Sequence, residues 1–497
     1  MTSASSSSTP PTHPAHTMPR RAAFAHRAAR RAVHRAVRLW ATSLATLLTT
    51  SLATPAHAQD TTPEGAIPAG SVTIRNLTIH PVSGPTIERG ELSFDKGVLT
   101  YVGPERVLAE GANVLPATQI NAAELAASGV IFDAAGLHAY PGLIAVNTQL
   151  GLTEISALRP TEDTNETGDA TPEATAATAF SPDSLLIPVT RSNGVLLAGV
   201  FPQGGLIPGT ASVMRLDGWT AGDMTVTRDA GVIVAWPSMR TFKKPVTDKP
   251  EDEQRRAIRE RIRTLENWFD RAKSYAAVRK AEPKTPIDLR LEALTRALPL
   301  NGKPAASPVF IHASELDQIL AAAEFVKARG LRAVIIGGRA APEAASVLKP
   351  LDIPIIVGGT FAFPTREDSA YDEAFTLPAR LKAAGLRFAI ASGEETPQER
   401  NLPYGAAKAA AHGLDRDEAL RAITLSAAEI MGIADRYGSI EQNKSATFFL
   451  SDDDPLEVTS HVRAAFIDGQ RSDLTNHQTR LRQKYREKYP QTKEPGK

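Results

Sequence analysis

The sequence predicts an α/β protein in which a barrel of alternating strands and helices is joined to a β domain built from both ends of the chain. Three observations predict this class. Short alternating strands follow residue 70, longer apolar runs alternate with helical segments beyond Pro141, and short strands return after Gly432. Continuous apolar runs are typical of parallel strands whose two faces are both covered by the protein.

The first 58 residues have the three-part layout of a secretory signal peptide. Seven arginines precede the apolar run 39–53, and Ala56-His57-Ala58 follows as a small-x-small cleavage site. Threonines and serines interrupt the run, which is too short to span a bilayer comfortably. We therefore expect export to the periplasm and no stable membrane anchor after cleavage. The pair Arg20-Arg21 leaves the twin-arginine route open beside the general secretory route.

Charge and cysteine content exclude several classes of function. The whole chain carries a net charge of +1, and because residues 1–58 hold seven arginines and no acid, residues 59–497 carry −6. No basic stripe with interleaved aromatic residues is present, so we expect no nucleic-acid partner. The absence of cysteine excludes disulfides and thiolate metal ligands. The remaining length suggests one large domain with an appendage, or two to three domains.

Two groups of short strands predict the β domain. Alternating apolar residues separated by Gly, Asp and Pro turns indicate an antiparallel sheet at 72–79, 90–94 and 97–103, with a further strand at 131–136. The second group, at 445–450 and 462–467, follows the central segment. A β domain assembled from both chain ends fits this order.

The central segment has the pattern of a barrel. Apolar runs, expected as buried strands, lie at 192–201, 309–311, 333–336, 353–357 and 388–391. Helical spacing follows at 318–329, 341–348, 377–384, 404–411 and 415–424. The C-terminal half of this segment, from residue 309, holds four strand–helix pairs in about 120 residues, which is typical of a (β/α) barrel. Residues 251–282 predict one long charged helix with a solvated face.

Five further stretches of the sequence are distinctive. They are Tyr140-Pro-Gly-Leu-Ile144, Gly204-Gly-Leu-Ile-Pro-Gly209, Leu216-Asp-Gly-Trp219, Asn443-Lys-Ser-Ala446 and Asp454-Pro-Leu456. With them the chain resembles a known family, the exported, imidazolonepropionase-like subgroup of the amidohydrolase superfamily, from about residue 70 to residue 472. The resemblance implies a (β/α)8 TIM-type barrel with a composite β-sandwich. We accordingly expect a signal peptide at 1–58, a linker at 59–70, the sandwich at 71–140 and 437–472, the barrel at 141–436 and a basic tail at 473–497.

The resemblance also implies a metal site, which this sequence does not reproduce. In the superfamily, a His-x-His pair, often a carboxylated Lys, two further histidines and an Asp hold one or two divalent metals that activate water. Here Asn147 and Gln149 occupy the positions of the pair, and carboxamides bind zinc far more weakly than imidazole. Arg339 follows a strand that would end in His, and Glu394 lies near the expected Asp. Only His312 ends a barrel strand as a ligand would, so any zinc site rests on it alone.

Three functions remain open at this point. As a hydrolase of cyclic-amide or related C–N bonds, the chain would use His312 as base or ligand, Glu394 as proton shuttle, and Asn147, Gln149 and Arg339 to orient the substrate. Alternatively, it is a catalytically silent periplasmic protein that binds a small molecule or pairs with an active paralogue or a second copy. A structural envelope protein is the third reading. An acidic segment after the first barrel strand fits a solvated loop better than a cation site; it contains Glu154, Asp163, Glu166 and Asp183.

Overall fold

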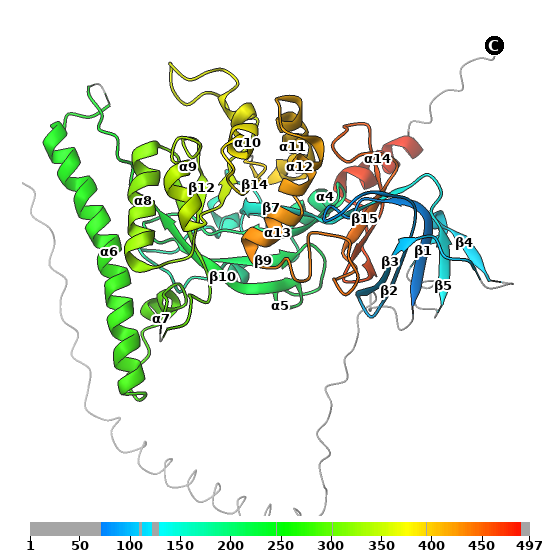
Figure 1. Cartoon of the computed structure of the whole chain (residues 1–497), viewed down its shortest axis with the longest axis horizontal. Coiled ribbons are helices and arrows are strands. Elements are labelled where there is room, and N and C mark those ends of the chain that lie inside the picture. Colours follow the sequence, from blue (N-terminus) through cyan, green and yellow to red (C-terminus); the bar gives the residue numbers. More distant parts are fainter. Residues whose placement is uncertain are drawn as a thin grey trace, which may run out of the picture. The chain divides into compact units, whose positions relative to one another are not determined.

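The structure, a computed structural model, describes residues 71–108, 112–121, 129–244, 246–300, 302–393 and 395–488. These residues form a nine-stranded and an eight-stranded sheet, the second surrounded by helices (Figure 1). The expected signal peptide and linker lie outside the described residues. Within the described ranges, no helix is long and apolar enough to cross a membrane.

Both ends of the chain contribute strands to the nine-stranded sheet. Its strands are β1 (Val72–Ile79), β2 (Ile87–Asp95), β3 (Val98–Pro104), β4 (Val114–Pro116), β5 (Val130–Asp133), β6 (His138–Pro141), β15 (Phe448–Ser451), β16 (Val462–Ile467) and β17 (Gln470–Arg471). They run in the order β17-β16-β15-β6-β1-β2-β3, with β5 on β1 and β4 on β5. The two chain ends meet where β6 pairs antiparallel with β15, with Tyr140 opposite Phe449. The composite β domain expected from the sequence is therefore present.

The eight-stranded sheet forms the barrel. Its strands, in chain order and in spatial order, are β7 (Leu143–Thr148), β8 (Val195–Val200), β9 (Gly209–Arg215), β10 (Thr225–Ala235), β11 (Val309–Ala313), β12 (Ala333–Gly337), β13 (Ile355–Val357) and β14 (Phe388–Ile390). Helix α13 (Leu425–Met431) packs against both terminal strands of this sheet. Next to it, the amide of Ile144 donates a 2.9 Å hydrogen bond to the carbonyl of Ile423. This near-closed sheet confirms the TIM-like barrel.

One strand differs from a regular parallel barrel. β9 is antiparallel to both β8 and β10, whereas the other neighbours in the sheet are parallel. The connection from β8 to β9 is too short for a crossover helix, which a parallel pair requires. Gly204 and Gly205 have φ values of 89° and 67° in this connection, and such left-handed conformations favour glycine. The stretch therefore makes a tight turn between antiparallel strands.

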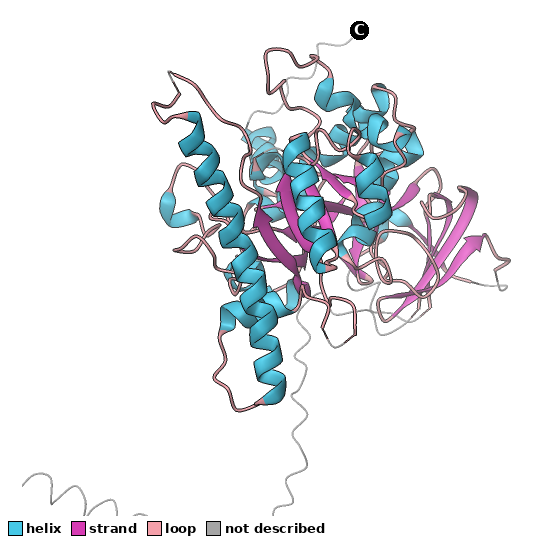
Figure 2. Ribbon diagram, turned by 60° about the vertical axis from the view of Figure 1, so that its left-hand side comes forward, coloured by secondary structure: helices cyan, strands magenta, loops and turns pink. Residues whose placement is uncertain are grey.

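The helices lie mostly outside the barrel sheet (Figure 2). They are α3 (Ala176–Ala179), α4 (Leu186–Arg191), α5 (Ala221–Met224), α6 (Glu251–Ala281), α7 (Leu289–Thr295), α8 (Leu316–Arg329), α9 (Ala345–Leu348), α10 (Glu373–Ala383), α11 (Leu402–Ala411), α12 (Arg416–Ala422), α13 and α14 (His477–Lys488). The predicted long charged helix is α6, which buries Leu265, Phe269, Ala272 and Tyr275 and exposes most of its charged residues.

The two faces of the barrel strands belong to two different apolar clusters. Side chains from all eight strands, among them Ile144, Val146, Phe310 and Ile336, pack with α13 in one cluster. Alternate residues of the same strands, such as Ile311, pack against the surrounding helices in another. Because successive strand residues point to opposite faces, the first cluster fills the barrel interior. The candidate site residues lie at the carboxyl ends of these strands.

Candidate functional site

Asn147 lies in a bulge at the end of β7. Its φ is 57°, a left-handed conformation that Asn tolerates better than most residues. The pairing of β7 with β8 shifts here, because Ala145 pairs with Ala198 but Thr148 pairs with Val200. Two residues of β7 thus oppose one residue of β8, and such bulges commonly re-aim the side chains that follow. The backbone conformation is by itself a reason for Asn at position 147.

A buried hydrogen bond holds the segment after the bulge. The Thr148 hydroxyl donates to a carboxylate oxygen of Glu399 at 2.7 Å and accepts from the amide of Leu150 at 3.2 Å. Glu399 belongs to η4 (Thr396–Asn401), which follows β14. The contact therefore joins the loop after the first barrel strand to the segment after the last one.

Gln149 opens into a pocket at this junction, which we call the Gln149 pocket. Its volume is about 290 Å³, and it is lined by Gln149, Thr153, Glu154, Ser156, Glu162, Thr164, Gln203, Glu395, Thr396 and Pro397. Glu154 has a structural role, because its carboxylate accepts from the Ser184 hydroxyl at 2.5 Å and from the Leu185 amide at 3.0 Å. Glu162 and Glu395 add two further carboxylates beside the carboxamide of Gln149.

His312 lies on the interior face of β11, two residues after Phe310 and nearer to the carboxyl end of the strand. It is partly buried, and burial alone lowers the pKa of its imidazole to about 4. A ring with this pKa is neutral at pH 7 and a weak base. His312 lines neither the Gln149 pocket nor the pocket that contains Arg339.

Arg339 belongs to a network of ion pairs. Its guanidinium contacts the carboxylate of Glu315, the hydroxyl of Thr365 and, at 3.7 Å, the carboxylate of Glu373. Glu315 also pairs with Arg366, so two guanidinium groups share one carboxylate. The side chains of Arg339 and Glu315 are mostly buried, at 15% and 16% exposure. Paired in this way, Arg339 is held in one position.

These residues line a second pocket of about 220 Å³, the Arg339 pocket. Three successive strand ends, the loop after β13 and helix α10 form its walls. The lining residues are Ser314, Glu315, Gly337, Arg339, Gly358, Gly359, Ala362, Phe363, Thr365, Glu373, Ala374 and Leu377. The pocket thus combines a charged side with an apolar side formed by Ala362, Phe363 and Leu377. Phe363 is 88% exposed on the loop that precedes α10.

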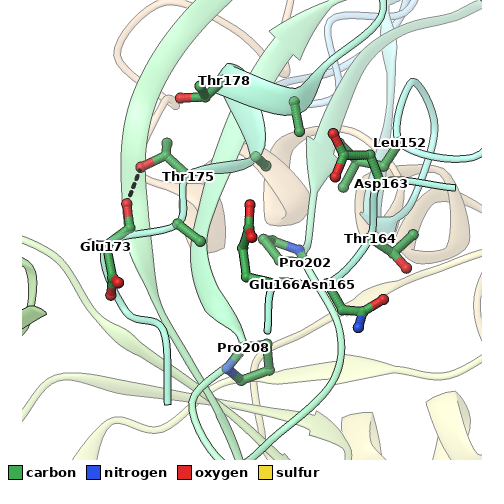
Figure 3. A pocket seen from close by; sticks show the side chains of 13 residues that line it. Leu152, Asp163, Thr164, Asn165, Glu166, Glu173, Thr175, Thr178, Pro202 and Pro208 are labelled. Atoms are coloured by element: carbon green, nitrogen blue, oxygen red, sulfur yellow. Dashed lines mark hydrogen bonds between the residues drawn. The ribbon is translucent and has the colours of Figure 1, made fainter. Parts of the chain in front are cut away.

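A third pocket, of about 210 Å³, lies beside the long connection after β7 (Figure 3). Asp163 and Thr164 line one side and Thr175 and Thr178 the other, with the carboxylate of Glu166 between them. The acidic segment named from the sequence therefore lies partly in a concavity. Among the described residues, no group of three or more His, Asp or Glu side chains is arranged to hold a metal ion.

The five residues proposed from the sequence do not share one pocket. Gln149 lines a pocket beside β7, β8 and the segment after β14. Arg339 lines a different pocket, at the ends of β11, β12 and β13. These two groups of strands occupy different parts of the barrel sheet. His312 faces the interior, Asn147 forms the bulge, and Glu394 lies outside the described residues.

The donor chemistry at these strand ends does not fit a divalent metal. Tight zinc sites use three or four imidazole, thiolate or carboxylate ligands. The described residues bring one imidazole, His312, and two carboxamides to these positions. The guanidinium of Arg339, always positive and without a free lone pair, follows β12. We therefore derive no reaction step through a metal.

Sequence reasoning missed the residues that complete the pockets. Glu395 directly follows Glu394, but the expected position of the superfamily Asp directed attention to the first of the two. Phe363 lies in a loop without a recognisable motif. The signal that could have revealed Glu315 is Glu315–Gln318, an N-terminal capping pattern that opens α8.

The chain was also compared with known proteins. No protein-family model matches it. An amidohydrolase of known structure from Thermotoga maritima MSB8 aligns with a TM-score of 0.67 and 22% identity, over 81% of this chain and 99% of that one. This likeness shows the shared fold.

A curated relative is similar in sequence. The amidohydrolase tasK of Hapsidospora irregularis is 24% identical over 419 residues, which cover 76% of this chain. The chain spans 39% of the length of that relative. The sequence likeness to this relative supports the amidohydrolase superfamily, whereas the structural likeness shows the shared fold.

Proposed function

We propose that this chain is a degenerate amidohydrolase-family protein, of the exported imidazolonepropionase-like subgroup, that binds a small molecule without metal-dependent hydrolysis. The observation that carries the proposal is the side-chain chemistry at the strand ends: a carboxamide after β7, one imidazole on β11 and an ion-paired guanidinium after β12. Metal ligands act as one unit, so the loss of several removes the function of the set.

The Arg339 pocket is the binding site in this proposal. Pockets for small molecules combine apolar walls with a few fixed polar groups, and they gather at the carboxyl face of such barrels. Phe363, which lines the Arg339 pocket, leaves 88% of its surface exposed, and Phe361 and Tyr371 of the same loop leave 41% and 78% exposed. Contiguous exposed apolar patches mark ligand-binding grooves and interaction sites.

The absence of metal-dependent hydrolysis is tested by elemental mass spectrometry on protein purified without chelators. We expect zinc, manganese and iron well below one equivalent, unrecovered after excess zinc is added. Near-stoichiometric metal that is lost in His312→Asn would overturn the degenerate-site proposal. A panel of cyclic amides, followed by chromatography of the products, supplies the matching activity measurement.

Binding at the Arg339 pocket is tested by closing it. Gly358 lines the pocket with a φ that other residues adopt, and a Cβ at this position meets no atom within 4 Å. A library of aromatic acids and amides is first screened for compounds that raise the melting temperature of the wild type. Gly358→Val should fold normally, and these compounds should no longer stabilise it. Gly84→Val is the matched control, because Gly84 is equally unobstructed but lies in an exposed turn of the β domain. Compounds that still stabilise Gly358→Val would place the site elsewhere.

Hydrolysis of cyclic-amide C–N bonds is the second candidate. The sequence suggests Glu394 as its proton shuttle, and Glu395, which lines the Gln149 pocket, is the neighbouring carboxylate that can take this role. The Gln149 pocket favours this candidate, because Glu162 and Glu395 place two carboxylates beside a carboxamide at the carboxyl end of the barrel. Carboxylates in such a position can act as general acid and base. Glu395→Gln should abolish turnover if this candidate holds, whereas turnover that persists in Glu395→Gln would exclude this pocket as its site.

Export is part of the same proposal. Its support is the arrangement of arginines, apolar run and cleavage site within residues 1–58. Cell fractionation followed by N-terminal sequencing should recover a periplasmic chain that begins at Gln59. A chain that keeps its N-terminal arginines and remains in the cytoplasm would reject this part. Size-exclusion chromatography then distinguishes a monomer from the second copy or paralogue that a partner role requires.

A further inference from the structure

The charge of this chain is divided unevenly between its body and its C-terminal end. Residues 477–497 hold seven lysines and arginines and two glutamates, a net charge of +5. Since residues 59–497 carry −6, residues 59–476 carry −11. A basic segment on an acidic body indicates an anionic partner more specifically than an evenly charged surface does.

Within the described residues, helix α14 carries most of this positive charge. It buries no residue, and it contains five cations and one carboxylate. The cations are Arg480, Arg482, Lys484, Arg486 and Lys488, and the carboxylate belongs to Glu487. Leu481 and Tyr485, one turn apart on the same face, are 36% and 51% exposed. The cations are therefore distributed around the helix, and Lys484 and Lys488 lie beside the apolar pair.

The base of α14 is firmly attached to the barrel. Arg191, buried at the end of α4, donates to the carbonyl of Asp473 at 2.7 Å and 3.0 Å. Asn476 donates to the Ser192 hydroxyl at 3.2 Å and accepts from the amide of Thr479 at 3.0 Å, which caps the helix. The helix thus starts from a fixed point of the fold (Figure 1). Each of its residues is exposed.

We propose that α14 docks this protein on the surface of an anionic lipid bilayer. A short helix that is exposed on all sides gains little from the fold, whereas clusters of four to eight lysines and arginines bind anionic headgroups. Leu481 and Tyr485 suit the boundary between headgroups and acyl chains, where Tyr is enriched. A nucleic acid would need a larger basic surface with interleaved aromatic residues.

The strength of binding to an anionic bilayer can be estimated from the contribution of each positive charge. Each lysine or arginine close to an anionic bilayer strengthens binding about fivefold, so two of them account for about 25-fold. Salt screens the attraction, because the Debye length falls to about 3 Å at 1 M. Docking should therefore be reversible and should disappear at high salt.

The experiment is co-sedimentation of the full chain with vesicles of pure phosphatidylcholine and with vesicles containing about one third phosphatidylglycerol. The wild type should bind the anionic vesicles alone, and Arg482→Gln/Arg486→Gln should weaken that binding by about 25-fold. Arg256→Gln/Arg259→Gln, which removes two exposed arginines of α6, is the charge-matched control and should bind as the wild type does. All variants share residues 1–70, so their differences report α14.

The outcomes separate the proposal from its competitors. Equal binding to both kinds of vesicle, wild-type binding by Arg482→Gln/Arg486→Gln, or an equal loss in the α6 control would each overturn it. A salt-sensitive dimer that the α14 variant disrupts, without vesicle binding, would assign the helix to a second copy of the chain. The proposed ligand pocket does not enter this test, so either proposal can fail alone.

Discussion

The hydroxyl of Thr148 donates a 2.7 Å hydrogen bond to the carboxylate of Glu399, although the two residues are 251 positions apart. The bond joins the segment after β7, which carries Gln149, to the segment after β14, which carries Glu395. The two strands themselves are the ends of the barrel sheet. The position of the Gln149 pocket therefore depends on a contact between the two ends of the barrel.

Removing this hydroxyl should destabilise the protein. Thr148→Val keeps the shape of the side chain but leaves a buried oxygen of Glu399 without this donor, which should lower the free energy of unfolding by about 1–3 kcal/mol. Urea denaturation followed by circular dichroism measures the change. Thr178→Val, at an exposed hydroxyl, should stay within about 0.5 kcal/mol of the wild type. Equal effects at the two positions would contradict a special role for Thr148.

The bulge predicts an unusual order of stability at position 147. At a φ of 57°, Asn147→Ala should lower the free energy of unfolding by about 1–2 kcal/mol, because a Cβ disfavours the left-handed region. Asn147→Gly should be closer to the wild type, since glycine enters that region freely. Denaturation of both variants checks this order. If Ala proves as stable as Gly, backbone conformation does not explain the Asn.

Burial of His312 predicts a loss of stability in acid. Its folded-state pKa, about 4, lies below the ordinary value of 6.5, so protonation favours the unfolded chain. This contribution is complete above pH 6.5 and is lost as the pH falls toward 4, by up to about 3 kcal/mol. The pKa of His80 is also lowered, first by burial and then by His138, and acts in the same direction. Unfolding curves between pH 7.5 and 4.5 should show a smaller loss in His312→Gln than in the wild type.

The contacts of Arg191 predict that this residue holds the C-terminal segment against the barrel. Besides the Asp473 carbonyl, its guanidinium reaches the Leu216 carbonyl at 2.8 Å and the Asp217 carboxylate at 2.9 Å. Arg191→Met should lower the free energy of unfolding by about 2–4 kcal/mol, because it leaves these acceptors without a charged donor. Limited proteolysis should then cleave near residue 473 sooner. Arg228→Met, at an exposed arginine that contacts Thr178, is the control and should leave the cleavage rate unchanged.

Much of the barrel could be predicted from local pattern. The apolar runs at 309–311 and 333–336 became β11 and β12, and the run at 192–201 contains β8. Burial on both faces imposes this pattern on each strand separately, so the sequence reveals it without knowledge of neighbours. β9 and β10 were not predicted, because an antiparallel hairpin inside a barrel has no signal of that kind.

The candidate site was predicted less well than the fold. The sequence by itself determined which side chains end the strands: carboxamides at 147 and 149, the imidazole of His312 and the guanidinium of Arg339. Only the tertiary structure decided that Gln149 and Arg339 open into different pockets and that Glu315 is shared by two arginines. The physical reason is the sequence separation of the contacts that determine each feature. Strand and helix periodicity is set by residues a few positions apart, whereas a pocket depends on loops whose positions are set by contacts across the whole barrel.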